Sequence, residues 1–258
     1  MKYIFSFLIF ISLNQVFAID SYQANESLNV LTLSGIKLRD KPGGTVLQSI
    51  PFASKVVTLE PKNNNFPVTV EGIKGSWVKV NFNDKIGYVF DGFLSRLPAP
   101  SLTDANLRAY VKREFKVLSE DLPLSYLAYS DLGATGNTVL FLEWNGQKCA
   151  YENHFYYEGG GENLSIPGVS MEEAYLLVRI IERDAYEYAL KEMIHPEDFD
   201  KRPYTEFVLN GVSYESAEDG SSIEKNDFYL CDLTSGCDYQ VTINKHENFV
   251  LINIGGGC

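Results

Sequence analysis

Cysteine and histidine have the most reactive side chains in this chain, so their spacing is the first test for catalysis. Cys149 and His154 lie in one predicted strand, whereas a catalytic thiolate needs an adjacent imidazole and usually a helix start. The other histidines, His195 and His246, are isolated, and no H-E-x-x-H spacing of a zinc peptidase occurs. The pattern gives no support for a peptidase, and no catalytic residue, metal ligand or cofactor is predicted.

A second chemistry to consider is glycan hydrolysis, which needs two carboxylates facing a cleft, one of them with a raised pKa. Several glutamates lie near aromatic residues that could stack on sugar rings: Glu143, Glu152, Glu158 and Glu162 among Trp144, Tyr151, Phe155, Tyr156 and Tyr157. With 34 acidic residues in the chain, such proximity says little, and an aromatic strand face is more often a packing surface. A carboxylate-based cell-wall glycan hydrolase therefore stays an alternative.

The first 18 residues have the pattern of a signal peptide. Lys2 is followed by an apolar run from Tyr3 to Leu13, and Val16-Phe17-Ala18 fits a cleavage site. A run of about eleven apolar residues is too short to span a bilayer. We therefore expect an exported protein of the periplasm or extracellular space, without a transmembrane anchor.

The charge of the chain narrows the classes of partner. It has 22 basic and 34 acidic residues and a net charge of −12. Such a chain repels nucleic acid by its long-range field. Nucleic-acid binding is not expected, and solubility is the simplest explanation of the acidity.

All four cysteines lie in the later part of the chain: Cys149, Cys231, Cys237 and Cys258. An even number in an exported chain predicts two disulfides, although four cysteines allow three connectivities. Cys231 and Cys237 flank a predicted hairpin loop and could pair easily, which leaves Cys149 for Cys258 by elimination. The glycines at 255–257 are interpreted as a flexible lead to the terminal thiol. A four-cysteine zinc site is disfavoured, because no C-x2-C pair occurs.

Residues 29–97 are predicted to form a small all-β barrel. Short β-branched and aromatic runs are bracketed by glycine, proline and asparagine. Alternation supports this prediction, because Val78 and Val80 fall on one face of a strand and Trp77 and Lys79 on the other. The predicted strands are 31–33, 36–39, 46–50, 55–59, 68–70, 76–81 and 86–90.

This region resembles the bacterial SH3-like (SH3b) domain. Four submotifs carry the resemblance: Ile36-Lys37-Leu38-Arg39-Asp40-Lys41-Pro42-Gly43; Val46-Leu47 with Ile50-Pro51; Ser76-Trp77-Val78-Lys79-Val80; and Ile86-Gly87-Tyr88-Val89 with Phe93-Leu94-Ser95. The resemblance covers roughly a quarter of the chain, and an Asn-rich insertion near Asn63 to Pro67 departs from it. It implies a non-catalytic targeting or binding module of an exported protein, often against peptidoglycan.

Within this region, Trp77, Tyr88, Phe90 and Phe93 are candidates for an aromatic ligand face, with Arg39 as a polar contact. Their alternative role is core filling in a small domain. We expect Phe90 and Phe93 to be buried. Arg39, Trp77 and Tyr88 are the predicted ligand-binding residues.

Residues 98–100 form a stiff linker to a second domain at 101–258. Helical periodicity starts after Thr103, the expected N-cap of a first helix. Ser170 and Glu173 form a capping box that opens a long helix. His195-Pro196 is expected to end that helix.

The second domain is otherwise β-rich. Asn145-Gly146 predicts a type I′ hairpin between strands 138–144 and 147–157. Further strands are expected at 207–209, 212–214, 227–231, 239–243 and 249–254. Leu122-Pro123 is expected to break the helical pattern of the first helix, and residues 158–168 are expected to form a loop. Grouped strands with hairpin turns predict an α+β domain on an antiparallel sheet.

These observations together favour an exported, non-catalytic binding protein of the cell envelope that recognises peptidoglycan or an envelope protein. The alternatives are a periplasmic enzyme inhibitor or immunity protein, whose acidic surface would suit a basic enzyme, and the carboxylate-based hydrolase.

Overall fold

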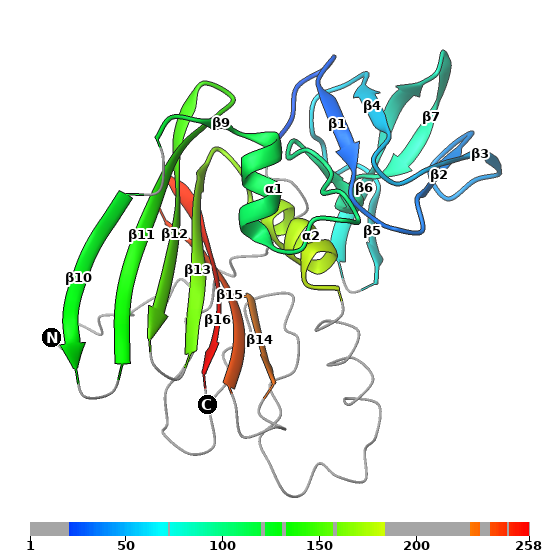
Figure 1. Ribbon diagram of the computed structural model, residues 1–258. Helices are drawn as coiled ribbons and strands as arrows, with labels where there is room; N and C mark the ends of the chain where they lie inside the picture. The colour runs from blue at the N-terminus through cyan, green and yellow to red at the C-terminus, as the bar shows by residue number, and fades with distance from the viewer. Residues whose placement is uncertain are drawn as a thin grey trace, which may run out of the picture.

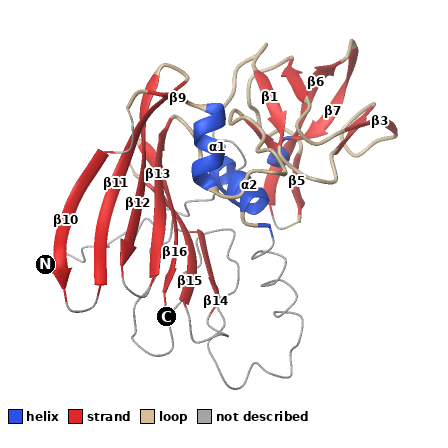
Figure 2. Cartoon of the chain, in the orientation of Figure 1, coloured by secondary structure: helices blue, strands red, loops and turns tan. Residues whose placement is uncertain are grey.

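The structure is a computed structural model of the chain. It describes residues 21–71, 73–119, 122–130, 133–156, 159–183, 228–232, 238–246 and 248–257. The predicted signal peptide at 1–18, the end of the predicted long helix and the predicted strands 207–209 and 212–214 lie outside these residues. The described part consists mostly of antiparallel sheet with two helices, and the helices lie between the two sheets (Figures 1 and 2).

The first sheet contains eight strands and a short 3-10 turn. They are β1 (Ser27–Val30), β2 (Ile36–Arg39), β3 (Val46–Ile50), β4 (Lys55–Thr58), β5 (Pro67–Val70), β6 (Ile73–Phe82), β7 (Lys85–Phe90), η1 (Asp91–Phe93) and β8 (Leu94–Ser95). The strand order is β3-β2-β7-β6-β4-β1-β8, and β5 pairs with β6. Every predicted strand from 36 to 90 has a counterpart here, whereas the predicted strand 31–33 does not.

The described strands of this sheet do not close into a barrel. β3 and β8 are its two edges and do not pair with each other. β8 has only two residues, which pair with β1 before the chain leaves the sheet toward the linker. The β-rich prediction is confirmed at this level, but the expected closure is absent from the described pairings.

The second sheet also has eight strands. They are β9 (Lys116–Val117), β10 (Leu122–Ser130), β11 (Gly133–Trp144), β12 (Gln147–Tyr156), β13 (Gly159–Pro167), β14 (Phe228–Asp232), β15 (Asp238–Lys245) and β16 (Phe249–Gly257). The strand order is β10-β11-β12-β13-β16-β15-β14, and β9 pairs with β11. All pairs are antiparallel.

The predicted hairpin is confirmed. Asn145 and Gly146 have φ angles of 51° and 75°, as a type I′ turn requires, and Trp144 pairs with Gln147 across them.

Two predictions for this sheet are wrong. Residues 159–167 form the central strand β13 instead of a loop, and Gly255 to Gly257 belong to β16 instead of a flexible lead. The glycines of these strands pair with one another, with Gly161 opposite Gly255 and Gly159 opposite Gly257. A Cβ on Gly161 would lie 2.6 Å from His154 Nε2 and 2.7 Å from the Ile254 carbonyl oxygen, and the backbone oxygen cannot turn away, so a larger residue does not fit there.

The two helices are α1 (Leu107–Glu114) and α2 (Met171–Ile181). The Ser170–Glu173 capping box of α2 is present as predicted. The N-cap of α1 is Asn106 rather than Thr103, and its Oδ1 accepts a hydrogen bond from the Ala109 amide at 2.9 Å. Among the described residues, no helix is both long and apolar enough to cross a membrane.

Both sheets and both helices contribute to one hydrophobic core. Its buried members include Leu28 and Leu94 of the first sheet, Leu107 and Tyr110 of α1, Leu176 and Leu177 of α2, and Leu140 and Ile252 of the second sheet. The linker is held against this core, because the Tyr110 hydroxyl donates to the Pro98 carbonyl at 3.0 Å.

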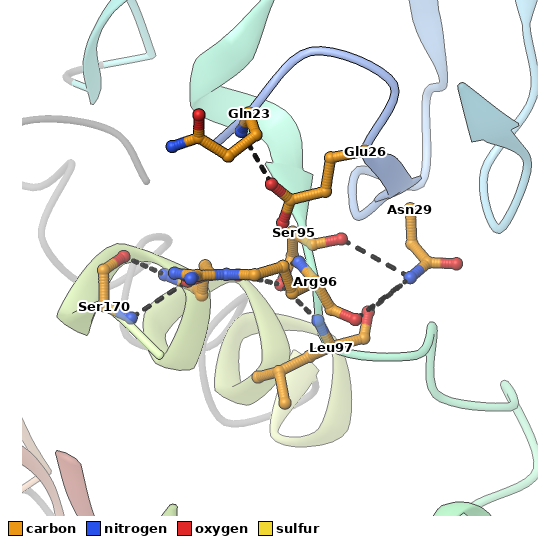
Figure 3. A network of polar contacts seen from close by, with 8 residues as sticks. Gln23, Glu26, Asn29, Ser95, Arg96, Leu97 and Ser170 are labelled. Carbon is orange, nitrogen blue, oxygen red and sulfur yellow. Dashed lines mark hydrogen bonds and ion pairs between the residues drawn. The ribbon is translucent and has the colours of Figure 1, made fainter. Parts of the chain in front are cut away.

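A buried carboxylate joins the first sheet to α2. Glu173 accepts hydrogen bonds from Arg96 through its amide at 2.7 Å, its Nε at 3.2 Å and its Nη2 at 2.5 Å. It also accepts from the Ser95 hydroxyl and the Ser170 amide. Figure 3 shows Ser95, Arg96 and Leu97 beside Ser170, with Asn29 reaching the same segment. This network fixes β8 against the start of α2.

Candidate ligand-binding site

The three predicted ligand-binding residues come together on adjacent strands β2, β7 and β6 (Figure 1). Arg39 pairs in register with Tyr88, and Tyr88 pairs with Lys79. Trp77 lies two residues before Lys79 and therefore on the same face. The Arg39 guanidinium carbon lies 5.6 Å from the centroid of the Trp77 ring, within the range of a cation–π contact.

Each of the three side chains is half-buried. Trp77 packs in part against the hydrophobic core, so it fills space and also presents surface. Phe90 and Phe93 are buried, with ring centroids 5.1 Å apart at 84°, as expected from the sequence. We define the aromatic–arginine site as Arg39, Trp77, Tyr88 and the additional residue Phe66.

Phe66 was missed by the sequence analysis. Its ring lies edge-on to Tyr88 at 6.5 Å and is 47% exposed. Its carbonyl accepts from the Trp77 amide at 3.0 Å, which ties the Asn-rich insertion to β6. The signal that could have identified it is a single aromatic residue in an otherwise polar insertion.

A tight turn holds Arg39 in place. Its Nη1 donates to the Gly44 carbonyl at 2.6 Å. Gly44 lies in the turn after β2, where its amide donates to the Lys41 carbonyl at 2.8 Å. One edge of the guanidinium is thereby fixed by the backbone and one face by the Trp77 ring.

Cys149 does not form a catalytic pair with His154. Both lie on β12, but they are an odd number of residues apart and therefore project from opposite faces of the sheet. Cys149 is buried and free, and burial raises the pKa of its thiol to about 11. The other described histidine, His246, stacks on Phe249 with ring centroids 4.6 Å apart, and His195 lies outside the described residues. No group of three potential metal ligands occurs in the part of the chain that is described.

The register of the second sheet bears on the predicted disulfides. Ala150, next to Cys149, aligns through Ser165 with Leu251 of β16. Gly257 lies six residues further along that strand, roughly 20 Å away, whereas bridged cysteines need Cα atoms within about 7 Å. Cys149 is therefore far from the described end of β16, and the residue after that end, Cys258, lies outside the described residues.

Of the other three cysteines, only Cys231 lies within the described residues. Cys231 lies on β14, opposite Gln240. Cys237 and Cys258 lie outside the described residues. Both predicted bonds, Cys231–Cys237 and Cys149–Cys258, therefore stay predictions.

The glutamates considered for hydrolysis are not gathered at one place. The register puts Glu143 and Glu152 on one face of the second sheet and Glu162 on the other. Glu143 lies four residues along β11 from the partner of Glu152, about 13 Å, which is beyond the separation of a catalytic pair. Glu143 instead forms an ion pair with Lys116 at 3.2 Å. Glu158 lies outside the described residues.

Glu162 has the most unusual environment of these acids. Its pKa is raised, first by burial and then by the nearby Glu182 carboxylate, while the Tyr151 hydroxyl and the Leu107 amide lower it by hydrogen bonding. Leu107 is the first residue of α1. Glu162 therefore holds the start of α1 against β13, which is a structural role.

No protein-family model matches the chain, and comparison with curated proteins and with solved structures finds no match either.

Proposed function

We propose that this protein is an exported, non-catalytic binding protein that recognises peptidoglycan or a protein of the cell envelope. In this proposal, residues 29–97 are an SH3b-like module, and residues 101–258 form an α+β region that supports it. The observation that carries the proposal is the aromatic–arginine site.

The chemistry of this site suits binding rather than catalysis. Half-exposed aromatic rings provide apolar contact area at a small cost in side-chain entropy, and an arginine adds directional donors. The site contains no nucleophile with an adjacent base, in keeping with a module that recognises a ligand without transforming it.

Sedimentation of the mature chain, residues 19–258, with purified peptidoglycan tests the proposal. The two regions share a core, so point variants are a better comparison than truncations. We expect W77A/Y88A to lose at least about tenfold in affinity for peptidoglycan, since each aromatic contact contributes on the order of 1 kcal/mol. F141A is the matched control, because Phe141 is 43% exposed on the second sheet.

Wild-type protein that stays in the supernatant would contradict wall recognition. Equal binding by wild type and W77A/Y88A would contradict the role of the aromatic–arginine site. Loss of binding by F141A as well would assign the effect to general surface hydrophobicity.

A further inference from the structure

The guanidinium of Arg39 is occupied on one edge only. Nη1 donates to the Gly44 carbonyl at 2.6 Å, and one face lies against Trp77 at 5.6 Å. Both contacts fix its orientation, so the remaining edge, formed by Nε and Nη2, has a defined direction.

That remaining edge has no acceptor among the residues that the structure describes. Nε is shielded from water and makes no hydrogen bond, and no described carboxylate forms an ion pair with Arg39. A shielded donor without a partner is unfavourable, because it has lost its water and gained nothing in exchange. A ligand that supplies an acceptor there removes this cost.

In two other arginines the same Nε–Nη2 edge donates hydrogen bonds to a carboxylate. Arg96 donates to Glu173 from Nε at 3.2 Å and from Nη2 at 2.5 Å. Arg113 donates to Asp104 from Nε at 3.2 Å and from Nη2 at 2.5 Å. In both pairs the two nitrogens meet the two oxygens of one carboxylate, which is the geometry that the guanidinium fork matches best.

We propose that the Nε–Nη2 edge of Arg39 binds a carboxylate of a peptide ligand, whose adjacent apolar part contacts Trp77, Tyr88 and Phe66. This inference rests on the proposed function and names the ligand class of the same site. The carboxylate oxygens accept from Nε and Nη2, and the rings cover the chain next to the carboxylate. Since Nε is shielded in the unliganded protein, binding includes a small shift of Arg39 or of the side chains around it.

The local charge favours an anionic group despite the acidic chain. Lys37 lies two residues before Arg39 on β2, and Lys79 lies beside Tyr88 on β6. Both therefore share the face of Arg39. A small carboxylate is attracted by these nearby charges, whereas a long polyanion also meets the field of a chain with a net charge of −12.

A matched pair of probes tests the carboxylate directly. N-acetyl-alanyl-alanine and its C-terminal amide differ only in the charged group. Each is titrated at millimolar concentrations into the mature chain, and the NMR signals of the Trp77 indole N–H and the Arg39 Nε–H are followed. We expect the acid to shift both signals and to bind about tenfold or more tightly than the amide, as for hydrogen bonds to a charged group.

Two variants separate the fork from simple charge. R39K keeps the positive charge but lacks the fork, and we expect it to lose about tenfold or more in affinity for the acid. K85Q removes one exposed charge from the opposite face of β7, and we expect its affinity to stay within about twofold of wild type. Unshifted Arg39 and Trp77 signals, equal binding of acid and amide, or full binding by R39K would each overturn the inference.

The same variants separate this inference from the proposed function. If W77A/Y88A loses peptidoglycan while R39K keeps it and acid and amide bind alike, carboxylate recognition is wrong and the binding function stands. If the wild-type protein does not co-sediment with peptidoglycan but still binds the acid more tightly than the amide through Arg39, wall binding is wrong and a peptide-binding role stands.

Discussion

At the scale of single residues, Glu162 links burial to pH. Its raised pKa means that the folded protein holds this proton more readily than the unfolded chain. The stability from this group is therefore fully present below the unfolded pKa of about 4.3 and is lost as pH rises through the folded pKa. Glutamine resembles the protonated form at every pH.

We therefore expect the stability of E162Q, relative to wild type, to increase as pH rises above about 4 and to level off once Glu162 is ionised in the folded protein. Urea unfolding of both proteins at a series of pH values measures the difference. E152Q is the control, because Glu152 lies on the opposite face of the sheet. A difference between E162Q and wild type that is constant with pH would contradict the assignment.

Cys149 gives a second prediction at this scale. With a pKa of about 11, about one thiol in a thousand is ionised at pH 8, and only the thiolate reacts. We expect iodoacetamide to modify Cys149 in the native protein far more slowly than in urea, as followed by mass spectrometry. Rapid labelling of native Cys149, or its recovery in a disulfide, would contradict the buried free thiol.

The residues of the aromatic–arginine site show what the sequence could and could not supply. Alternation along β6 and the resemblance to SH3b domains identified Trp77, Tyr88 and Arg39. Phe66 escaped because its approach to Tyr88 depends on how the insertion folds back along β6. The unpaired Nε–Nη2 edge of Arg39 could not be predicted from the sequence either, since it depends on which acceptors the fold places around the guanidinium.

At the scale of elements, local chemistry predicted turns and caps better than strands made of glycine. The Asn145-Gly146 hairpin and the Ser170 capping box each satisfy backbone requirements within a few residues. β13 was missed because Gly159 to Gly161 have no side chains that favour a strand, and only pairing with the neighbouring strands β12 and β16 orders them. Periodicity likewise places the start of α1 no better than one turn, which is the distance between Thr103 and Asn106.

The N-cap of α1 provides a matched test. Asn106 accepts the Ala109 amide, whereas the Thr103 hydroxyl contacts only the Ser101 hydroxyl. We expect N106A to lower the free energy of unfolding by about 1 kcal/mol and T103A to have little effect. Urea denaturation compares the two. An equal loss of unfolding free energy in both variants would contradict the assignment of Asn106 as the N-cap.

At the scale of the whole molecule, the shared core predicts that the two sheets unfold together. The only two tryptophans report on them separately, since Trp77 lies in the first sheet and Trp144 in the second. W144F and W77F each leave one reporter. We expect coincident urea transitions from these two proteins once their midpoints are corrected for the substitutions. Two separate transitions would show that the sheets are independent.

Glu173 is the residue on which this coupling depends most. Its side chain is fully buried against Arg96, so E173A removes the charged acceptor of a half-buried guanidinium and of several other donors. We expect a loss of about 3 kcal/mol and an earlier transition of the first sheet, reported by Trp77 in the W144F background. Glu71 bonds to Arg179 of α2 at 2.7 Å but is exposed, so E71A should cost less than about 1 kcal/mol. Since both pairs bridge the first sheet and α2, a similar cost for the two variants would mean that apolar packing, rather than the Glu173 network, holds the sheets together.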